Sequence, residues 1–240
     1  MLTRFRQTGS RAVDTYGRAI RIINAGVLTA GRGFAGLLVG ALLLSATAQA
    51  SETPVIVAFG DSLTAGYGLE DADSFPVRLE ASLAENGTPA RVINSGVSGD
   101  TTAGGRARLA WSLPEEVDLV ILELGANDGL RAIDPAETEA NLDAMLAELQ
   151  RRDIDVLLAG MLAPPNLGWE YGEAFNSVFP RLAEKYDATF YPFFLDGVAA
   201  DPALNQPDGI HPNAEGVARI VERITPYVLR ALDGDATAAR

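Results

Sequence analysis

The chain has 240 residues, with 19 basic and 32 acidic side chains, one histidine, no cysteine and a net charge of −13. The lack of cysteine excludes disulfide bonds, thiolate catalysis and cysteine metal sites. The acidity serves solubility and argues against nucleic acid and anionic membrane surfaces as partners, because both repel a negatively charged protein.

The first 50 residues differ from the rest of the chain. They hold six arginines and one acidic residue, then the apolar run 34–44, and they end in the small-residue pattern Ala48-Gln49-Ala50. This layout is typical of a secretory signal peptide, so we expect cleavage after Ala50, a periplasmic or secreted protein, and no membrane span after cleavage. An uncleaved amphipathic anchor is the alternative, although the apolar run is shorter than the roughly 20 residues of a membrane span. A translation start near Val27 would explain the long basic segment.

Apolar runs alternate with helix-like segments through residues 51–232, and the tail 233–240 is expected to be disordered. The predicted elements, in chain order, are a strand at 55–59, a helix at 75–85, a strand at 90–94, a helix at 101–113, a strand at 117–124, a helix at 135–151, a strand at 154–162, a helix at 169–185, a strand at 188–194 and a helix at 214–232. Strands that alternate with helices and are buried on both faces indicate a parallel sheet between two helix layers. We therefore predict one α/β domain, a three-layer α/β/α sandwich with a five-stranded parallel sheet.

Polar segments follow four of the five predicted strands. They are residues 60–62, 95–100 and 125–129, and, somewhat later than the last strand, 208–211. Ligands bind beyond the carboxyl ends of the strands in open sheets of this kind. The four segments are therefore expected to meet at one edge.

The side chains in these segments suggest nucleophilic catalysis. A serine hydroxyl needs a base to become a nucleophile, and the single histidine, His211, is the only imidazole available to Ser62. Asp208 lies three residues before His211, where it can orient the ring. Ser62 lies on a predicted strand-to-helix turn, which is expected to project its hydroxyl into solvent at the edge of the sheet. Taken alone, Ser62 would more often be a helix N-cap, and His211 a surface residue. Neither alternative explains why both fall at the same edge.

Acyl transfer also needs hydrogen-bond donors for the developing oxyanion. The backbone N–H of Gly99 and the side-chain amide of Asn127 lie in two of the same segments, although each residue is also common in ordinary turns. Asp61, Asp100 and Asp128 could instead be metal ligands. Such a metal site would consist almost entirely of oxygen ligands. We expect no metal and no cofactor, and the sequence has no nucleotide-binding loop in a suitable context.

The four segments resemble the four blocks of the SGNH (GDSL-type) hydrolases. The matching residues are Phe59-Gly-Asp-Ser-Leu63, Gly99 within 97–100, Gly125-x-Asn-Asp128 and Asp208-x-x-His211, in the family's order. The resemblance covers about residues 54–230 and is strongest to the periplasmic thioesterase I, lysophospholipase and arylesterase branch. It implies a flavodoxin-like sheet, a catalytic triad of Ser62, Asp208 and His211, and an oxyanion hole of the Ser62 N–H, Gly99 and Asn127. Ala126 stands where a second glycine is common, which implies a slightly narrower pocket.

The sequence thus predicts a secreted serine esterase that hydrolyses acyl or aryl esters, thioesters or lysophospholipids through an acyl-enzyme. A carbohydrate O-acetylesterase, a non-catalytic periplasmic binding protein on the same fold, and a metal phosphoesterase are the alternatives. Residues 161–171 follow a strand and are rich in apolar groups, so they suggest a wall of the substrate site or, equally, a packed surface loop. Within them we expect Leu162, Pro164, Trp169 and Tyr171 to contact substrate. We expect a monomer or a weak oligomer.

Overall fold

The computed structural model describes residues 53–234. The expected signal peptide, residues 1–50, and most of the expected disordered tail, 233–240, lie outside the described residues. Among the residues that are described, no helix is both long and apolar enough to cross a membrane.

Five parallel strands form one sheet, in the order β2-β1-β3-β4-β5. This order is that of flavodoxin-like folds, and it confirms the predicted α/β class and the five-stranded parallel sheet. The strands are β1 (Val55–Gly60), β2 (Arg91–Gly96), β3 (Leu119–Glu123), β4 (Asp155–Ala159) and β5 (Thr189–Tyr191).

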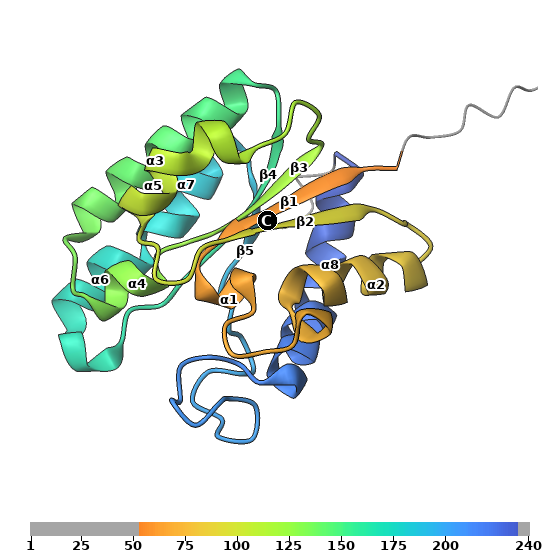
Figure 1. The fold of residues 1–240 in the computed structure, drawn as a ribbon. Coiled ribbons are helices and arrows are strands. Elements are labelled where there is room, and N and C mark those ends of the chain that lie inside the picture. Colours follow the sequence, from red (N-terminus) through yellow and green to blue (C-terminus); the bar gives the residue numbers. More distant parts are fainter. Residues whose placement is uncertain (1–52, 235–240) are drawn as a thin grey trace, which may run out of the picture. The chain divides into compact units, whose positions relative to one another are not determined.

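Helices cover both faces of the sheet (Figure 1). One layer consists of α2 (Phe75–Glu85) and α8 (Ala214–Leu232), and the other of α3 (Thr102–Ser112), α5 (Pro135–Arg151) and α7 (Val178–Tyr186). Shorter helices lie in the connections: α1 (Ser62–Ala65), η1 (Asp71–Asp73), α4 (Ala126–Leu130), η2 (Pro165–Leu167) and α6 (Trp169–Asn176).

The helices α2, α5 and α8 begin and end where the sequence predicts. Two of them start at capping residues: Asp134 accepts a hydrogen bond from the Ala136 N–H, and Asn213 accepts one from the Gly216 N–H. Such caps satisfy backbone donors that have no partner inside a helix. Pro135 follows its cap at the first helical position, where its missing N–H is not needed.

Other boundaries differ from the prediction. The single helix expected at 169–185 is two helices, α6 and α7, with Ser177 between them. β4 ends at Ala159 rather than at 162, and the next residue, Gly160, lies so close to the chain after β5 that a Cβ there would be 2.3 Å from the carbonyl oxygen of Pro192. β5 ends at Tyr191, directly before Pro192, which has no N–H for the ladder. The short helices α1 and α4 were not predicted.

The core is centred on β1 and β3. Their apolar side chains from Ile56 to Phe59 and from Leu119 to Leu122 are fully buried. Burying a side chain of this size stabilises the fold by about 1.5–3 kcal/mol relative to leaving it in water. The expectation that every strand is buried on both faces is wrong for β2, which pairs with β1 alone and has exposed or half-exposed residues throughout.

Candidate active site

Ser62 lies where β1 turns into the short helix α1. Asp61 is the N-cap of this helix, and its Oδ1 accepts a hydrogen bond from the Leu63 N–H at 3.0 Å. The alternative of Ser62 as a helix N-cap is therefore wrong. Ser62 is also only 9% exposed and lines a cavity. We expected its hydroxyl to project into open solvent, and it does not.

The turn before Ser62 rests on a buried acid. Glu123, at the end of β3, is fully buried, and its Oε2 accepts hydrogen bonds from Thr64 Oγ1 at 2.7 Å and from the Asp61 N–H at 3.3 Å. A Cβ at Gly60 would lie 2.4 Å from this oxygen, so only glycine permits the approach. Burial raises the pKa of Glu123 well above its usual value, and the negative charge of Asp61 raises it further. Burial thus favours the neutral form of the carboxyl group that supports the turn.

His211 contacts both of its expected partners. Its Nε2 lies 2.9 Å from Ser62 Oγ, and its Nδ1 lies 2.7 Å from Asp208 Oδ2. The other oxygen of Asp208 accepts hydrogen bonds from the N–H groups of Ile210 and His211. The hydrogen bond from the His211 ring, and then these backbone donors, lower the pKa of Asp208 to about 2. Asp208 is therefore ionised at neutral pH and favours the tautomer with the proton on Nδ1.

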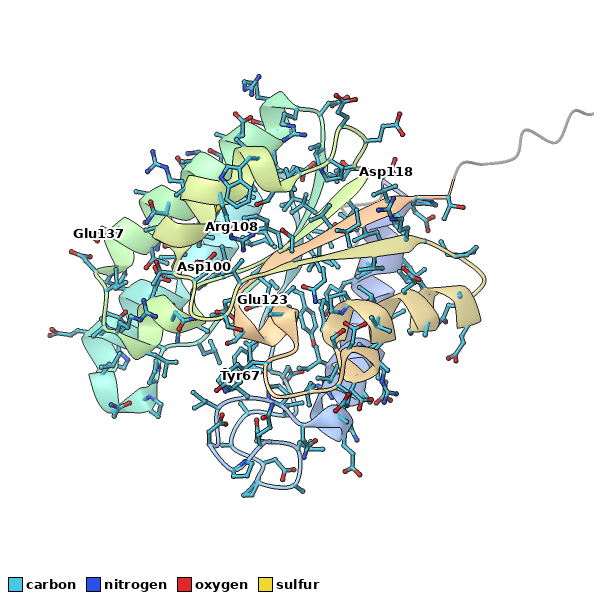
Figure 2. The ribbon with its side chains drawn as sticks, viewed as in Figure 1. Tyr67, Asp100, Arg108, Asp118, Glu123 and Glu137 are labelled. Atoms are coloured by element: carbon cyan, nitrogen blue, oxygen red, sulfur yellow. The ribbon has the colours of Figure 1, made fainter. Side chains whose placement is uncertain are left out.

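Further contacts hold the loop that carries His211. The Gln206 N–H donates to the His211 carbonyl oxygen at 2.7 Å, and the Gln206 side-chain amide donates to the carbonyl oxygen of Tyr67 at 2.7 Å. The Tyr67 ring lies 4.5 Å from the imidazole, centroid to centroid. Figure 2 shows Tyr67 next to this loop, below the end of the sheet. Sequence reasoning missed Tyr67 because nothing local indicates a contact with a residue so distant in the chain.

The two expected oxyanion donors line the same cavity as Ser62 and His211. Gly99 has a φ of +85°, in the left-handed region that favours glycine. The Asn127 Nδ2 donates to Asp61 Oδ2 at 2.9 Å, which leaves the second N–H of the amide for another acceptor. Burial raises the pKa of Asp61 to about 6, although the Leu63 N–H and Asn127 favour its charged form.

The three aspartates considered as metal ligands have other partners. Asp61 binds Asn127, Asp100 forms an ion pair with Arg108, and Asp128 accepts hydrogen bonds from the N–H and the hydroxyl of Thr102. Among residues 53–234 no group of three or more histidine, aspartate or glutamate side chains is arranged to hold a metal ion.

A cavity of about 640 Å³ opens beside the triad. This size lies within the usual range for a small-molecule site. Besides Ala126, its apolar lining includes Leu130, Met161, Leu162, Pro164, Phe193 and Ile210.

The loop 161–171 contributes only its first half to this lining. Leu162 and Pro164 line the cavity as expected, whereas Trp169 and Tyr171 lie outside it. Trp169 begins α6 and is 76% exposed. Tyr171 instead packs against Phe175, and its hydroxyl donates to the Ile133 carbonyl oxygen at 2.8 Å.

The chain is similar to several known proteins. The model of the GDSL-like lipase/acylhydrolase family matches residues 58–219. The chain is 40% identical to esterase TesA of Pseudomonas aeruginosa, over 79% of this chain and 95% of that protein. It is 39% identical to an arylesterase of Vibrio mimicus, over 79% and 94% of the two chains. It is 37% identical to thioesterase 1/protease 1/lysophospholipase L1 of Escherichia coli K12, over 72% and 82%.

A solved structure shows the same similarity. AlinE4, an esterase of the SGNH-hydrolase family, is 52% identical to this chain and superposes with a TM-score of 0.64. The match covers 76% of this chain and 98% of AlinE4.

Proposed function

The chain belongs to the GDSL-like lipase/acylhydrolase family, the SGNH hydrolases, and we propose that it hydrolyses esters through an acyl-enzyme formed on Ser62. That it is an ester-hydrolysing serine hydrolase follows from the family and from its named esterase relatives. The observation that carries the proposed mechanism is the chain of hydrogen bonds from Ser62 Oγ through His211 to Asp208, at 2.9 and 2.7 Å.

In the first half of the reaction, Ser62 Oγ attacks the carbonyl carbon of the substrate. His211 Nε2 accepts the hydroxyl proton, and Asp208 stabilises the imidazolium ion that results. The tetrahedral intermediate then collapses and its bond to the leaving alcohol or thiol breaks. The leaving group takes the proton from Nε2, and the acyl group remains on Ser62 as an ester.

In the second half, water attacks the acyl-Ser62 carbonyl carbon while His211 Nε2 takes a proton from it. The new intermediate collapses, the bond to Ser62 Oγ breaks, and that oxygen recovers its proton from Nε2. The carboxylic acid leaves and the resting state returns. No cofactor takes part in this cycle.

Three donors serve the negatively charged oxygen of both intermediates: the N–H groups of Ser62 and Gly99, and the Asn127 amide. Loss of one such donor typically slows catalysis by about 10²–10³-fold. Asn127 is suited to this role because its bond to Asp61 fixes the amide at the cavity wall.

The cavity lining indicates the substrate class. Apolar groups dominate it, so acyl or aryl groups gain from burial there, whereas sugar hydroxyls would lose hydrogen bonds to water. This favours carboxylic esters, thioesters and lysophospholipids over the O-acetylated carbohydrates of the alternative reading. The relatives named esterase, arylesterase, thioesterase and lysophospholipase are consistent with such a range. The arginine-rich and apolar start of the sequence supports action in the periplasm or outside the cell.

A series of p-nitrophenyl esters from acetate to palmitate tests this proposal. We expect hydrolysis by the wild type, with the highest kcat/KM at a chain that fills the cavity, and loss of activity in Ser62→Ala and His211→Ala. His211 is the only histidine in the sequence, so no second imidazole can replace it. Unchanged hydrolysis in either variant contradicts the mechanism, and a strict preference for acetylated sugars over these esters contradicts the substrate class.

A further inference from the structure

The position of Gly99 depends on a tight turn. The Asp100 N–H donates to the Val97 carbonyl oxygen at 3.0 Å, which closes a four-residue turn with Gly99 at its third position. A positive φ at that position is typical of glycine-containing turns. The Gly99 N–H takes no part in the closing bond and can serve an acceptor in the cavity. The start of the turn is tied to β1 by its own backbone, because the Val97 N–H donates to the Gly60 carbonyl oxygen at 3.0 Å. The position of the Gly99 N–H relative to Ser62 therefore depends on this bond and on whatever holds Asp100 at the other end of the turn.

Arg108, on α3, joins the turn to the end of β1, the strand that leads to Ser62. Its Nε donates to Asp100 Oδ2 at 2.6 Å, and its Nη2 donates to the Gly60 carbonyl oxygen at 2.8 Å. Its Nη1 donates to Ser95 Oγ, near the end of β2, at 3.2 Å. Figure 2 shows Arg108 and Asp100 close together on the α3 side of the sheet. One guanidinium thus spans the ends of two strands and the turn.

The surroundings leave this guanidinium little freedom. The Arg108 side chain is 7% exposed, and its Cζ lies 3.9 Å from the centroid of the Phe59 ring. A Cβ at Gly104 would lie 2.6 Å from Asp100 Oδ1, so glycine gives the carboxylate room beside α3.

A contribution to stability does not by itself explain why the buried residue at position 108 is a charged arginine. A buried ion pair can often be replaced by apolar side chains without loss of stability, because removing both charges from water is costly. What apolar side chains cannot supply is a rigid planar fork that binds three acceptors in fixed directions. That geometry suits a group whose task is to hold three segments at set distances.

We propose that Arg108 is a positioning residue for the oxyanion site: it holds the 97–100 turn against the Gly60 carbonyl and so fixes the Gly99 N–H relative to Ser62. This inference rests on the proposed function, since it assigns a task within the same reaction. Arg108 itself touches no reacting atom.

Lysine at position 108 provides the direct test. Its ammonium group keeps the positive charge but cannot reach Asp100, Ser95 and Gly60 in the fixed geometry of the guanidinium. A misplacement of about 1 Å can cost about 10²-fold in rate. We expect Arg108→Lys to lower kcat for p-nitrophenyl acetate by about 10- to 100-fold and to change KM by less than about threefold.

The measurement must separate positioning from folding. Titration of Ser62 to completion with a fluorophosphonate counts the competent sites, and kcat is then expressed per titrated site. A purely structural role lowers the number of sites and leaves kcat per site unchanged, and that result overturns the inference. Arg181→Lys is the matched control, because Arg181 pairs with Glu139 on the surface, and it should leave kcat per site unchanged.

Two milder variants decide the matter if Arg108→Lys does not fold. Asp100→Asn and Ser95→Ala each weaken one contact of the fork, and each should lower kcat per site while the site count is retained. Normal kcat per site in both overturns the inference. The proposed function is judged separately, because it requires an active wild type and an inactive Ser62→Ala. If the wild type is active and Ser62→Ala is inactive, a normal kcat per site in Arg108→Lys contradicts only the proposed role of Arg108 and leaves the proposed function intact.

Discussion

The Asn127 side-chain amide donates to Asp61 Oδ2 at 2.9 Å, and the other oxygen of Asp61 accepts from the Leu63 N–H. The residue directly before Ser62 therefore caps the helix that begins at Ser62 and also holds Asn127, the proposed oxyanion donor. Asp61 is fully buried, so the contact is shielded from water. The second residue of the Gly-Asp-Ser-Leu segment thus connects two of the four sequence blocks.

Asp61→Asn tests this connection. Asparagine keeps an oxygen for the Leu63 N–H but places a donor opposite the amide of Asn127, so that amide loses its anchor. We expect kcat to fall by about 10- to 100-fold, and Asn127→Ala to lower it by about 10²–10³-fold. The double variant should be no slower than Asn127→Ala alone. Multiplicative losses in the double variant contradict the connection.

Asp208→Asn tests the orientation of His211. The charged carboxylate holds the proton on Nδ1, whereas an amide can also donate and so permits the wrong tautomer. We expect kcat for p-nitrophenyl acetate to fall by about 10²–10⁴-fold, with KM little changed. The pKa of Asp208 is about 2, so wild-type activity between pH 4 and 8 should show no step from this residue. A carboxyl titration assigned to Asp208 by NMR within that range contradicts the assignment.

Glu123→Gln tests the raised pKa of the carboxyl group beneath the turn. Because the folded state raises the pKa of Glu123, the folded protein binds this proton more tightly than the unfolded chain does. The resulting stabilisation is complete below the unfolded pKa, near 4.3, and declines as the pH rises towards the folded pKa. The glutamine side chain does not titrate, so its contribution to stability does not change with pH. The Tm of Glu123→Gln minus that of the wild type should therefore increase from pH 4 to pH 8, with kcat largely retained.

A Tm difference between Glu123→Gln and the wild type that stays constant over this range would show that folding does not raise the pKa of Glu123. Thr64→Val is the companion variant, because it removes the hydroxyl that donates to Glu123 while leaving the carboxyl in place. It should lower Tm and leave the direction of the pH dependence unchanged.

Leu162→Ser tests the apolar wall. Leu162 lines the cavity and Trp169 does not, although both lie in the segment that the sequence marked as a candidate wall. Loss of apolar contact should raise KM for p-nitrophenyl octanoate by about five- to tenfold, in line with about 1 kcal/mol of lost burial, and leave the acetate unchanged. Trp169→Ala should alter neither substrate. An equal effect of Trp169→Ala would place the acyl chain along α6 instead.

Local sequence patterns predict the fold well where the boundaries of an element depend on residues within or next to that element. The helix Pro135–Arg151 has a cap at Asp134, a proline at its first position and one apolar face, and its predicted and observed limits agree. The strand β4 was predicted too long: it ends at Ala159, beside the close approach of Gly160 to Pro192. That approach is a property of the packed sheet and leaves no periodic signal in the sequence.

The same distinction applies to the site. Ser62, Gly99 and Asn127 follow β1, β2 and β3, whose carboxyl ends lie at the same edge of the sheet, so topology brings these three residues to one cavity. His211 lies well after β5, in the loop just before α8, and lines the same cavity. The contacts of Asp61 with Asn127, Arg108 with Gly60, and Tyr67 with His211 join residues far apart in the sequence. Each depends on side-chain directions in the folded protein. A single sequence cannot supply those directions.

The most direct test of the central claim is covalent labelling of Ser62. The wild type is treated with a fluorophosphonate, its intact mass is measured, and the modified peptide is sequenced by mass spectrometry. We predict one adduct per chain, located on Ser62, with hydrolytic activity lost in proportion to labelling and no adduct in Ser62→Ala. Labelling of Ser62→Ala to the same extent, or an adduct at another residue with Ser62 unmodified, contradicts the account.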